Sequence, residues 1–243
     1  MMDNIVKLYG LDHSGSHYLA YLLHNNFPNM VVLHSHTGWN HGKIVDKFNW
    51  DATEWNTDPH FNGVREKLGE LVKREPLNSG KSVTHYKNQI KHLYKNETLP
   101  LLILIRNPFD WLYSYNIKHY HGIKWKTLQN TVKLWSEINR DYFTHWWPKK
   151  HFIKYENLRD NTQEELNKIS NFLGINLLDD FIDTDLDAVS LSNDRPERKF
   201  EMGGGKERCI KEHQKMFGIT PQEFEEIFEE NIDKEVLNTY IGL

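Results

Sequence analysis

The segment from Leu101 to Arg106 constrains the fold most, because it is apolar at every position until it ends in an arginine. Continuous apolar runs are typical of strands in parallel sheets, where helices cover both faces. Other short β-prone runs lie at 5–9, 30–33, 82–85 and 152–155. Segments with helical spacing lie at 16–26, 108–120, 125–143, 162–173 and after Pro221. This alternation favours an α/β fold, a single doubly wound domain over residues 1–243 with a central parallel sheet.

Composition narrows the classes of function. The chain has 34 acidic and 30 basic residues, a net charge of −4, and so lacks the basic excess expected of a protein that binds duplex nucleic acid. A single cysteine, Cys209, excludes an intrachain disulfide and a cysteine zinc cluster, and it fits a reducing compartment. We see neither a targeting segment nor an apolar run of membrane-spanning length. The prediction is a cytoplasmic protein with no nucleic-acid or membrane partner.

The segment Gly10–His17 stands between a predicted strand and a predicted helix, with glycines at 10 and 15. Such a loop can bind an anion through backbone N–H groups and the helix N-terminus, although an ordinary strand-to-helix turn is an equally open interpretation. Nucleoside triphosphatases need Lys and then Ser or Thr after the second glycine, where this chain has Ser16 and His17. We therefore expect a phosphate-like ligand held without a metal.

Two further segments carry basic residues. Arg106 ends the apolar run, at the edge of the sheet where open α/β folds bind ligands, and Ser114 follows it on the next predicted helix. Asn107 and Pro108 have a structural explanation, since both residue types are favoured at the start of a helix. Arg106 has no such explanation, and arginine is suited to bidentate phosphate binding. A solvent-exposed arginine is the alternative interpretation. Near the end of the chain, Arg198-Lys199 precedes Gly203-Gly204-Gly205, which either closes over a phosphate or is a solvated loop.

Taken in order, these segments resemble the sulfotransferases that use 3′-phosphoadenosine 5′-phosphosulfate (PAPS), particularly their cytosolic branch. Asp12–Leu19 is similar to the family's P-K-S-G-T-T-W-L loop, and Arg106–Ser114 matches its R-N-P-x-D-x-x-x-S motif in full. Residues 198–206 resemble R-K-G-x-x-G-x-W-K, with departures at Phe200 and Gly205. Tyr155–Leu158 resembles the Y-E-D-L segment. The resemblance implies a P-loop-like fold.

It also implies a role for each matching residue. The 5′-phosphosulfate would be bound by Ser14, Gly15, Ser16 and His17. The 3′-phosphate would be bound by Arg106, Ser114, Arg198 and Lys199. Adenine would be contacted by Tyr18 and Tyr155, although Tyr18 can also be read as a core ring of its helix. PAPS is then the co-substrate, adenosine 3′,5′-bisphosphate the product, and no metal is required.

For catalysis, the resemblance places His85, in Val83-Thr84-His85, at the family's catalytic histidine, where an imidazole can take the proton of a hydroxyl or amine acceptor. His13 stands where the family usually has Lys or Arg, and we expect it to assist the leaving group. This replacement leaves a catalytically silent nucleotide-binding module open, and a P-loop kinase or phosphotransferase is the other alternative. The acceptor is expected to be a small molecule or a carbohydrate. The ring- and histidine-rich stretch from His34 to Phe61 is expected to be a long loop or an insertion.

Overall fold

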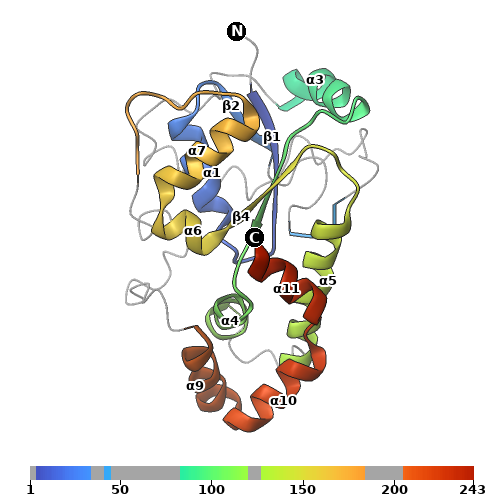
Figure 1. Cartoon of the computed structure of the whole chain (residues 1–243), viewed down its shortest axis with the longest axis vertical. Helices are drawn as coiled ribbons and strands as arrows, with labels where there is room; N and C mark the ends of the chain where they lie inside the picture. Colours follow the sequence, from blue (N-terminus) through green and yellow to red (C-terminus); the bar gives the residue numbers. More distant parts are fainter. Residues whose placement is uncertain (1–3, 34–40, 45–82, 120–126, 184–204) are drawn as a thin grey trace.

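The computed structural model describes residues 4–33, 41–44, 83–119, 127–183 and 205–243. Its centre is a parallel sheet of four strands in the order β2-β1-β3-β4 (Figure 1). The strands are β1 (Asn4–Gly10), β2 (Met30–Leu33), β3 (Leu101–Ile105) and β4 (Lys150–Lys154). Lys7 of β1 pairs with Leu101, and Leu101 pairs with Lys150, so the carboxyl ends of β1, β3 and β4 lie at the same edge. The predicted α/β class with a central parallel sheet is confirmed.

Helices pack on both faces of the sheet because alternate side chains of each strand point to opposite sides. One face carries Val6, Leu8, Leu102 and Leu104, which are buried together with side chains of three helices. These helices are α1 (Ser16–Asn26), α6 (Tyr155–Asp160) and α7 (Thr162–Leu173). α7 has the bounds expected from its spacing and ends at Gly174, whose φ of 68° is left-handed.

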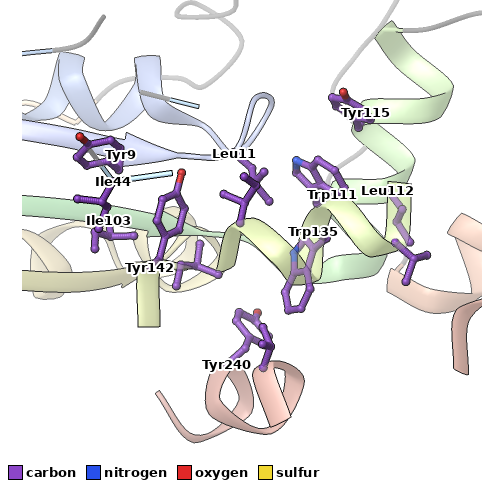
Figure 2. Packing of buried hydrophobic residues seen from close by; sticks show 14 of the residues in the cluster. Tyr9, Leu11, Ile44, Ile103, Trp111, Leu112, Tyr115, Trp135, Tyr142 and Tyr240 are labelled. Carbon is purple, nitrogen blue, oxygen red and sulfur yellow. The ribbon is translucent and has the colours of Figure 1, made fainter. Parts of the chain in front are cut away.

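The opposite face carries the larger and more aromatic part of the core. Its helices are α4 (Pro108–Leu112), α5 (Leu128–Thr144), α9 (Gly205–Phe217), α10 (Pro221–Asn231) and α11 (Lys234–Gly242). Figure 2 shows Tyr9 and Tyr142 near each other, with ring centroids 6.1 Å apart. Farther along, Trp135 meets Tyr240 edge-on at 6.0 Å. Aromatic rings thus supply much of the buried surface on this side.

The expected strand at 82–85 is wrong: the chain is helical from Val83, in α3 (Val83–Lys95). Apolar positions of its second half recur at helical spacing, since Ile90 is buried and Leu93 and Tyr94 pack beside the same core. Tyr94 stacks on Trp147 with ring centroids 4.9 Å apart. These tertiary contacts outweigh the β propensity of a three- or four-residue run.

The predicted helix at 108–120 is helical through its described part but changes its hydrogen bonding on the way. After α4, residues Tyr113–His119 form a π-helix, η2. The helix expected at 125–143 begins at Leu128, where the Thr127 hydroxyl accepts a hydrogen bond from the N–H of Asn130 at 3.2 Å. Most of the stretch 34–61 and residues 198–204 lie outside the described ranges, and the assignment of residues 1–243 to one domain stays a prediction.

Candidate active site

The loop between β1 and α1 leads from the carboxyl end of a central strand into a helix N-terminus. Gly15 precedes α1 with φ 96°, and no side chain caps the first turn of this helix. The first N–H groups of a helix have no carbonyl partners within the helix, and the helix dipole is positive at that end. An anion in front of α1 would therefore meet backbone donors and a favourable field.

Both glycines of the loop lie against other parts of the chain. A Cβ atom on Gly15 would lie 2.5 and 2.6 Å from two ring carbons of Tyr155. A Cβ atom on Gly10 would lie 2.7 Å from the Ser14 hydroxyl and 2.9 Å from the carbonyl oxygen of Leu104 in β3. The loop is thus packed tightly onto β3 and the start of α6, and this explains the glycine at each position.

Arg106 follows β3 and reaches across to this loop. Its guanidinium donates a hydrogen bond to the carbonyl of His13 at 2.8 Å. It also lies over the ring of Tyr155, 4.5 Å from the ring centroid. Its own carbonyl accepts a hydrogen bond from the indole of Trp135 at 3.1 Å. The predicted residues Gly15, Arg106 and Tyr155 therefore form one contiguous group at the carboxyl edge of the sheet.

Two buried polar atoms in this group lack a hydrogen-bond partner among the described residues: the Arg106 Nε and the Ser14 hydroxyl. Leaving a buried donor unsatisfied costs about 1–3 kcal/mol, and more for a charged group. A phosphate or sulfate oxygen is an acceptor that a guanidinium and a hydroxyl can both bind. The loop and Arg106 thus present the donor chemistry that an anionic group needs.

Glu156 holds the turn that carries Arg106. One of its carboxylate oxygens accepts a hydrogen bond from the backbone N–H of Asn107 at 2.9 Å. The other accepts a hydrogen bond from the Tyr240 hydroxyl at 3.1 Å, on the final helix α11. Asn107 in turn caps α4 by accepting from the N–H of Phe109 at 2.9 Å. The start of α6 and α11 together fix the backbone immediately after Arg106.

His13 lies in the loop with φ 62°, a left-handed conformation. Its N–H donates to the Asp12 carboxylate at 3.1 Å, and its imidazole Nε2 lies 3.8 Å from the other carboxylate oxygen. The Asp12 carboxylate is also 3.9 Å from Nε2 of His41, whose Nδ1 is 2.7 Å from the Gly10 carbonyl oxygen. Asp12 thus stands between two imidazoles at the start of the loop.

The remaining loop residues begin α1. Ser16, its first residue, is buried, and His17 is half-buried. Tyr18 is buried in the core beneath α1, where its hydroxyl lies 3.3 Å from the Thr162 hydroxyl of α7. Burial, the main cause, raises the pKa of Tyr18 to about 12. This placement explains Tyr18 as a core residue, and its contact with adenine stays a prediction.

Tyr155 and Ser114 lie on the elements that flank Arg106. Tyr155 is the first residue of α6, and burial raises the pKa of its hydroxyl, an effect that Arg106 opposes. Ser114 is buried in η2, one residue before Tyr115, whose ring stacks on Trp111 with centroids 4.7 Å apart (Figure 2). The Trp111 indole donates to the Asp12 carbonyl at 2.7 Å, so this helical segment also contacts the loop.

Three predicted residues are not brought into this group. His85 belongs to α3, which Figure 1 shows at the end of the sheet away from α4. Arg198 and Lys199 lie outside the described residues. Their predicted roles remain untested.

Sequence reasoning missed several residues of this site. His41 lies in a stretch without periodicity, and its proximity to the loop depends on tertiary folding alone. Glu156 belongs to the segment that resembles Y-E-D-L. Its carboxylate could therefore have been predicted to accept a hydrogen bond from the backbone at the end of the neighbouring strand. Trp111, fully buried, follows the R-N-P turn at a spacing that could have indicated a contact with the loop.

Comparison with known proteins gives the family of the chain. A family model described as the sulfotransferase domain matches residues 17–234, which is most of the chain. The match begins at His17 and does not include the loop residues from Gly10 to Ser16. No solved structure matches the chain. Within the described ranges, no helix is long and apolar enough to cross a membrane. The chain belongs to the sulfotransferase family.

Proposed function

We propose that the protein transfers a sulfuryl group from PAPS to a hydroxyl or amine of a small-molecule or carbohydrate acceptor, releasing adenosine 3′,5′-bisphosphate. The observation that carries the proposal is the placement of Arg106. Its guanidinium bonds the loop at His13, lies on the Tyr155 ring, and has a buried Nε with no partner among the described residues. PAPS differs from ATP in carrying a 3′-phosphate on the ribose. A guanidinium at the carboxyl edge of the sheet can bind this phosphate.

In this proposal the loop binds the phosphosulfate, and Arg106 with Ser114, Arg198 and Lys199 binds the 3′-phosphate. The Ser14 hydroxyl and the loop N–H groups of residues 15–17 face the negative charge that grows as the sulfur–oxygen bond breaks, since the Ser14 N–H already donates to the Leu11 carbonyl at 2.9 Å. The acceptor oxygen or nitrogen forms the new bond to sulfur and loses its proton to a general base. The family resemblance assigns this role to His85, and the assignment requires His85 to approach the loop from α3, at the other end of the sheet from α4. His13 donates a proton or a hydrogen bond to the departing phosphate oxygen, the task that Lys or Arg performs in relatives.

Thermal unfolding tests the donor site. Adenosine 3′,5′-bisphosphate at 100 times its Kd, with EDTA present, should raise the Tm by about 5–10 °C. ATP with Mg²⁺ should shift it by less than about 2 °C, because ATP lacks the 3′-phosphate. The reverse pattern would contradict the assignment of Arg106 and favour a triphosphate site. Stabilisation by the bisphosphate, combined with no transfer from labelled PAPS to any of a broad acceptor panel, would favour a silent binding module.

The role of His13 predicts a separation of catalysis from binding. His13→Asn should lower kcat by about 100-fold, the usual loss of one donor to a developing charge, with donor Kd changed by less than about threefold. Asparagine is chosen because it tolerates the left-handed φ of 62° at this position. His13→Lys should retain activity. His92→Asn, at an exposed position of α3, is the matched control. Unchanged turnover of His13→Asn at unchanged donor affinity would defeat the role.

A further inference from the structure

A buried chain of polar side chains joins three helices behind the predicted donor site. His213 of α9, Asn116 of η2 and Thr131 of α5 are all buried. The His213 Nε2 lies 3.2 Å from the Asn116 amide nitrogen, and the Asn116 amide oxygen lies 3.1 Å from the Thr131 hydroxyl. At the other end, the His213 Nδ1 lies 2.7 Å from the Cys209 carbonyl oxygen. The chain therefore runs from α9 through η2 to α5.

The partners fix where the protons lie. A carbonyl oxygen can only accept, so the His213 Nδ1 carries a proton and donates it to Cys209. The His213 Nε2 then accepts from the Asn116 amide, whose oxygen accepts from the Thr131 hydroxyl. This arrangement needs a neutral imidazole, and burial lowers the pKa of His213 in agreement with that state. The single proton of the Thr131 hydroxyl is shared between two acceptors, the Asn116 amide oxygen at 3.1 Å and the Thr127 carbonyl oxygen at 3.0 Å.

The polar side chains hold η2, which is an unusual element. π-helices are rare, and where they occur they often mark functional sites. Asn116 is the central residue of η2 (Tyr113–His119). One residue before it, the Tyr115 ring stands edge-on to the His13 ring of the loop at 6.1 Å. Ser114, the residue before Tyr115, is buried and is the one assigned to the 3′-phosphate. A single turn thus contacts the polar chain on one side and the loop on the other.

We propose that His213 is a positioning residue for the 3′-phosphate of the donor, holding η2 in its π-helical form so that Ser114 keeps its place relative to Arg106. The inference rests on the proposed function. Without an acceptor at Nε2, the buried Asn116 amide loses its partner, and the segment can relax toward ordinary α-helical bonding. Such a change would rotate Ser114 and Tyr115 relative to the preceding turn, while leaving the contacts of Arg106 with the loop in place.

The test compares affinities for two ligands, adenosine 3′,5′-bisphosphate and adenosine 5′-phosphate, by calorimetry. Their ratio reports recognition of the 3′-phosphate alone. His213→Leu should reduce this ratio about tenfold. His213→Gln, whose side-chain carbonyl can replace Nε2 as the acceptor, should keep the ratio within about threefold of the unsubstituted protein. His151→Leu is the matched control, a half-buried histidine of β4 that stacks on Phe172 with centroids 5.1 Å apart on the opposite face.

A second pair of variants protects the test against misfolding and against a purely structural role. Thr131→Val keeps the side-chain volume, removes the donor to Asn116, and should lower the ratio about threefold. Ser114→Ala should lower the ratio in the unsubstituted protein and have no further effect beside His213→Leu. A ratio unchanged in folded His213→Leu or, where that variant does not fold, in Thr131→Val overturns the inference, even if the Tm falls. An unsubstituted protein with no preference for the bisphosphate instead overturns the proposed function.

Discussion

Replacing Arg106 with alanine is expected to weaken binding of adenosine 3′,5′-bisphosphate by about 100-fold, the loss of about 3 kcal/mol from a bidentate charged contact. Affinity for adenosine 5′-phosphate should fall by no more than about tenfold, because Arg106 contacts the loop only at the carbonyl of His13. Arg106→Lys should give an intermediate loss, since an ammonium can pair with a phosphate but cannot supply a planar fork or the same stacking on Tyr155. Isothermal titration calorimetry with both ligands measures these differences.

Arg140→Ala is the control for this experiment. Arg140 lies on α5, is half exposed, and pairs with Asp233 and Glu235. Its removal takes away a guanidinium and its ion pairs but should leave both ligand affinities unchanged. Equal losses of affinity for the two ligands in Arg106→Ala would mean that Arg106 serves only to shape the loop, and the assignment to the 3′-phosphate would be wrong.

Gly15→Ala should be the most damaging small substitution in the loop. An alanine there adopts a φ of 96° and places its Cβ 2.5 Å from the Tyr155 ring. The left-handed backbone costs about 1–2 kcal/mol and the steric overlap about 1–3 kcal/mol. Together they should lower the Tm by roughly 5–15 °C and weaken donor binding, because Tyr155 must move away from Arg106. Differential scanning calorimetry and bisphosphate titration measure the two effects.

Gly174→Ala separates the two causes. Gly174 has a similar left-handed φ of 68°, but nothing lies within 4 Å of a Cβ added there. This variant should show the backbone cost alone, with donor affinity intact. If the two glycine variants lose the same stability, the contact between Gly15 and Tyr155 is not the reason for glycine in the loop.

The elements that could be predicted from the sequence are those with strong local signals. Leu101–Ile105 is apolar throughout, and α7 runs from Thr162 to Leu173 before a left-handed glycine. Gly15 and Arg106 could be assigned because each stands at a strand or helix terminus, where the parallel sheet brings such positions to one edge. Local pattern and global fold agree at these positions.

The rest depended on contacts between distant segments. A short β-prone run at 82–85 carried no sign that Val83 would begin a helix packed against Trp147. The π-helical bonding of Tyr113–His119 depends on partners from α5 and α9, and no spacing within that segment encodes it. His41 reaches the Gly10 carbonyl from a stretch without periodicity. Burial of Tyr18 against Thr162 likewise follows from how α1 and α7 meet.

The hydrogen bond from Tyr240 to Glu156 spans 84 residues of sequence and has a consequence for biosynthesis. Ribosomes synthesise a chain from its amino end. The sheet and the turn that carries Arg106 can therefore fold while α11 is still being made. Until Tyr240 emerges, one oxygen of Glu156 lacks this partner, although the same carboxylate already holds the N–H of Asn107. The turn behind Arg106 is therefore completed late, and a nascent chain completes the proposed donor site only when nearly all of the described sequence has been translated.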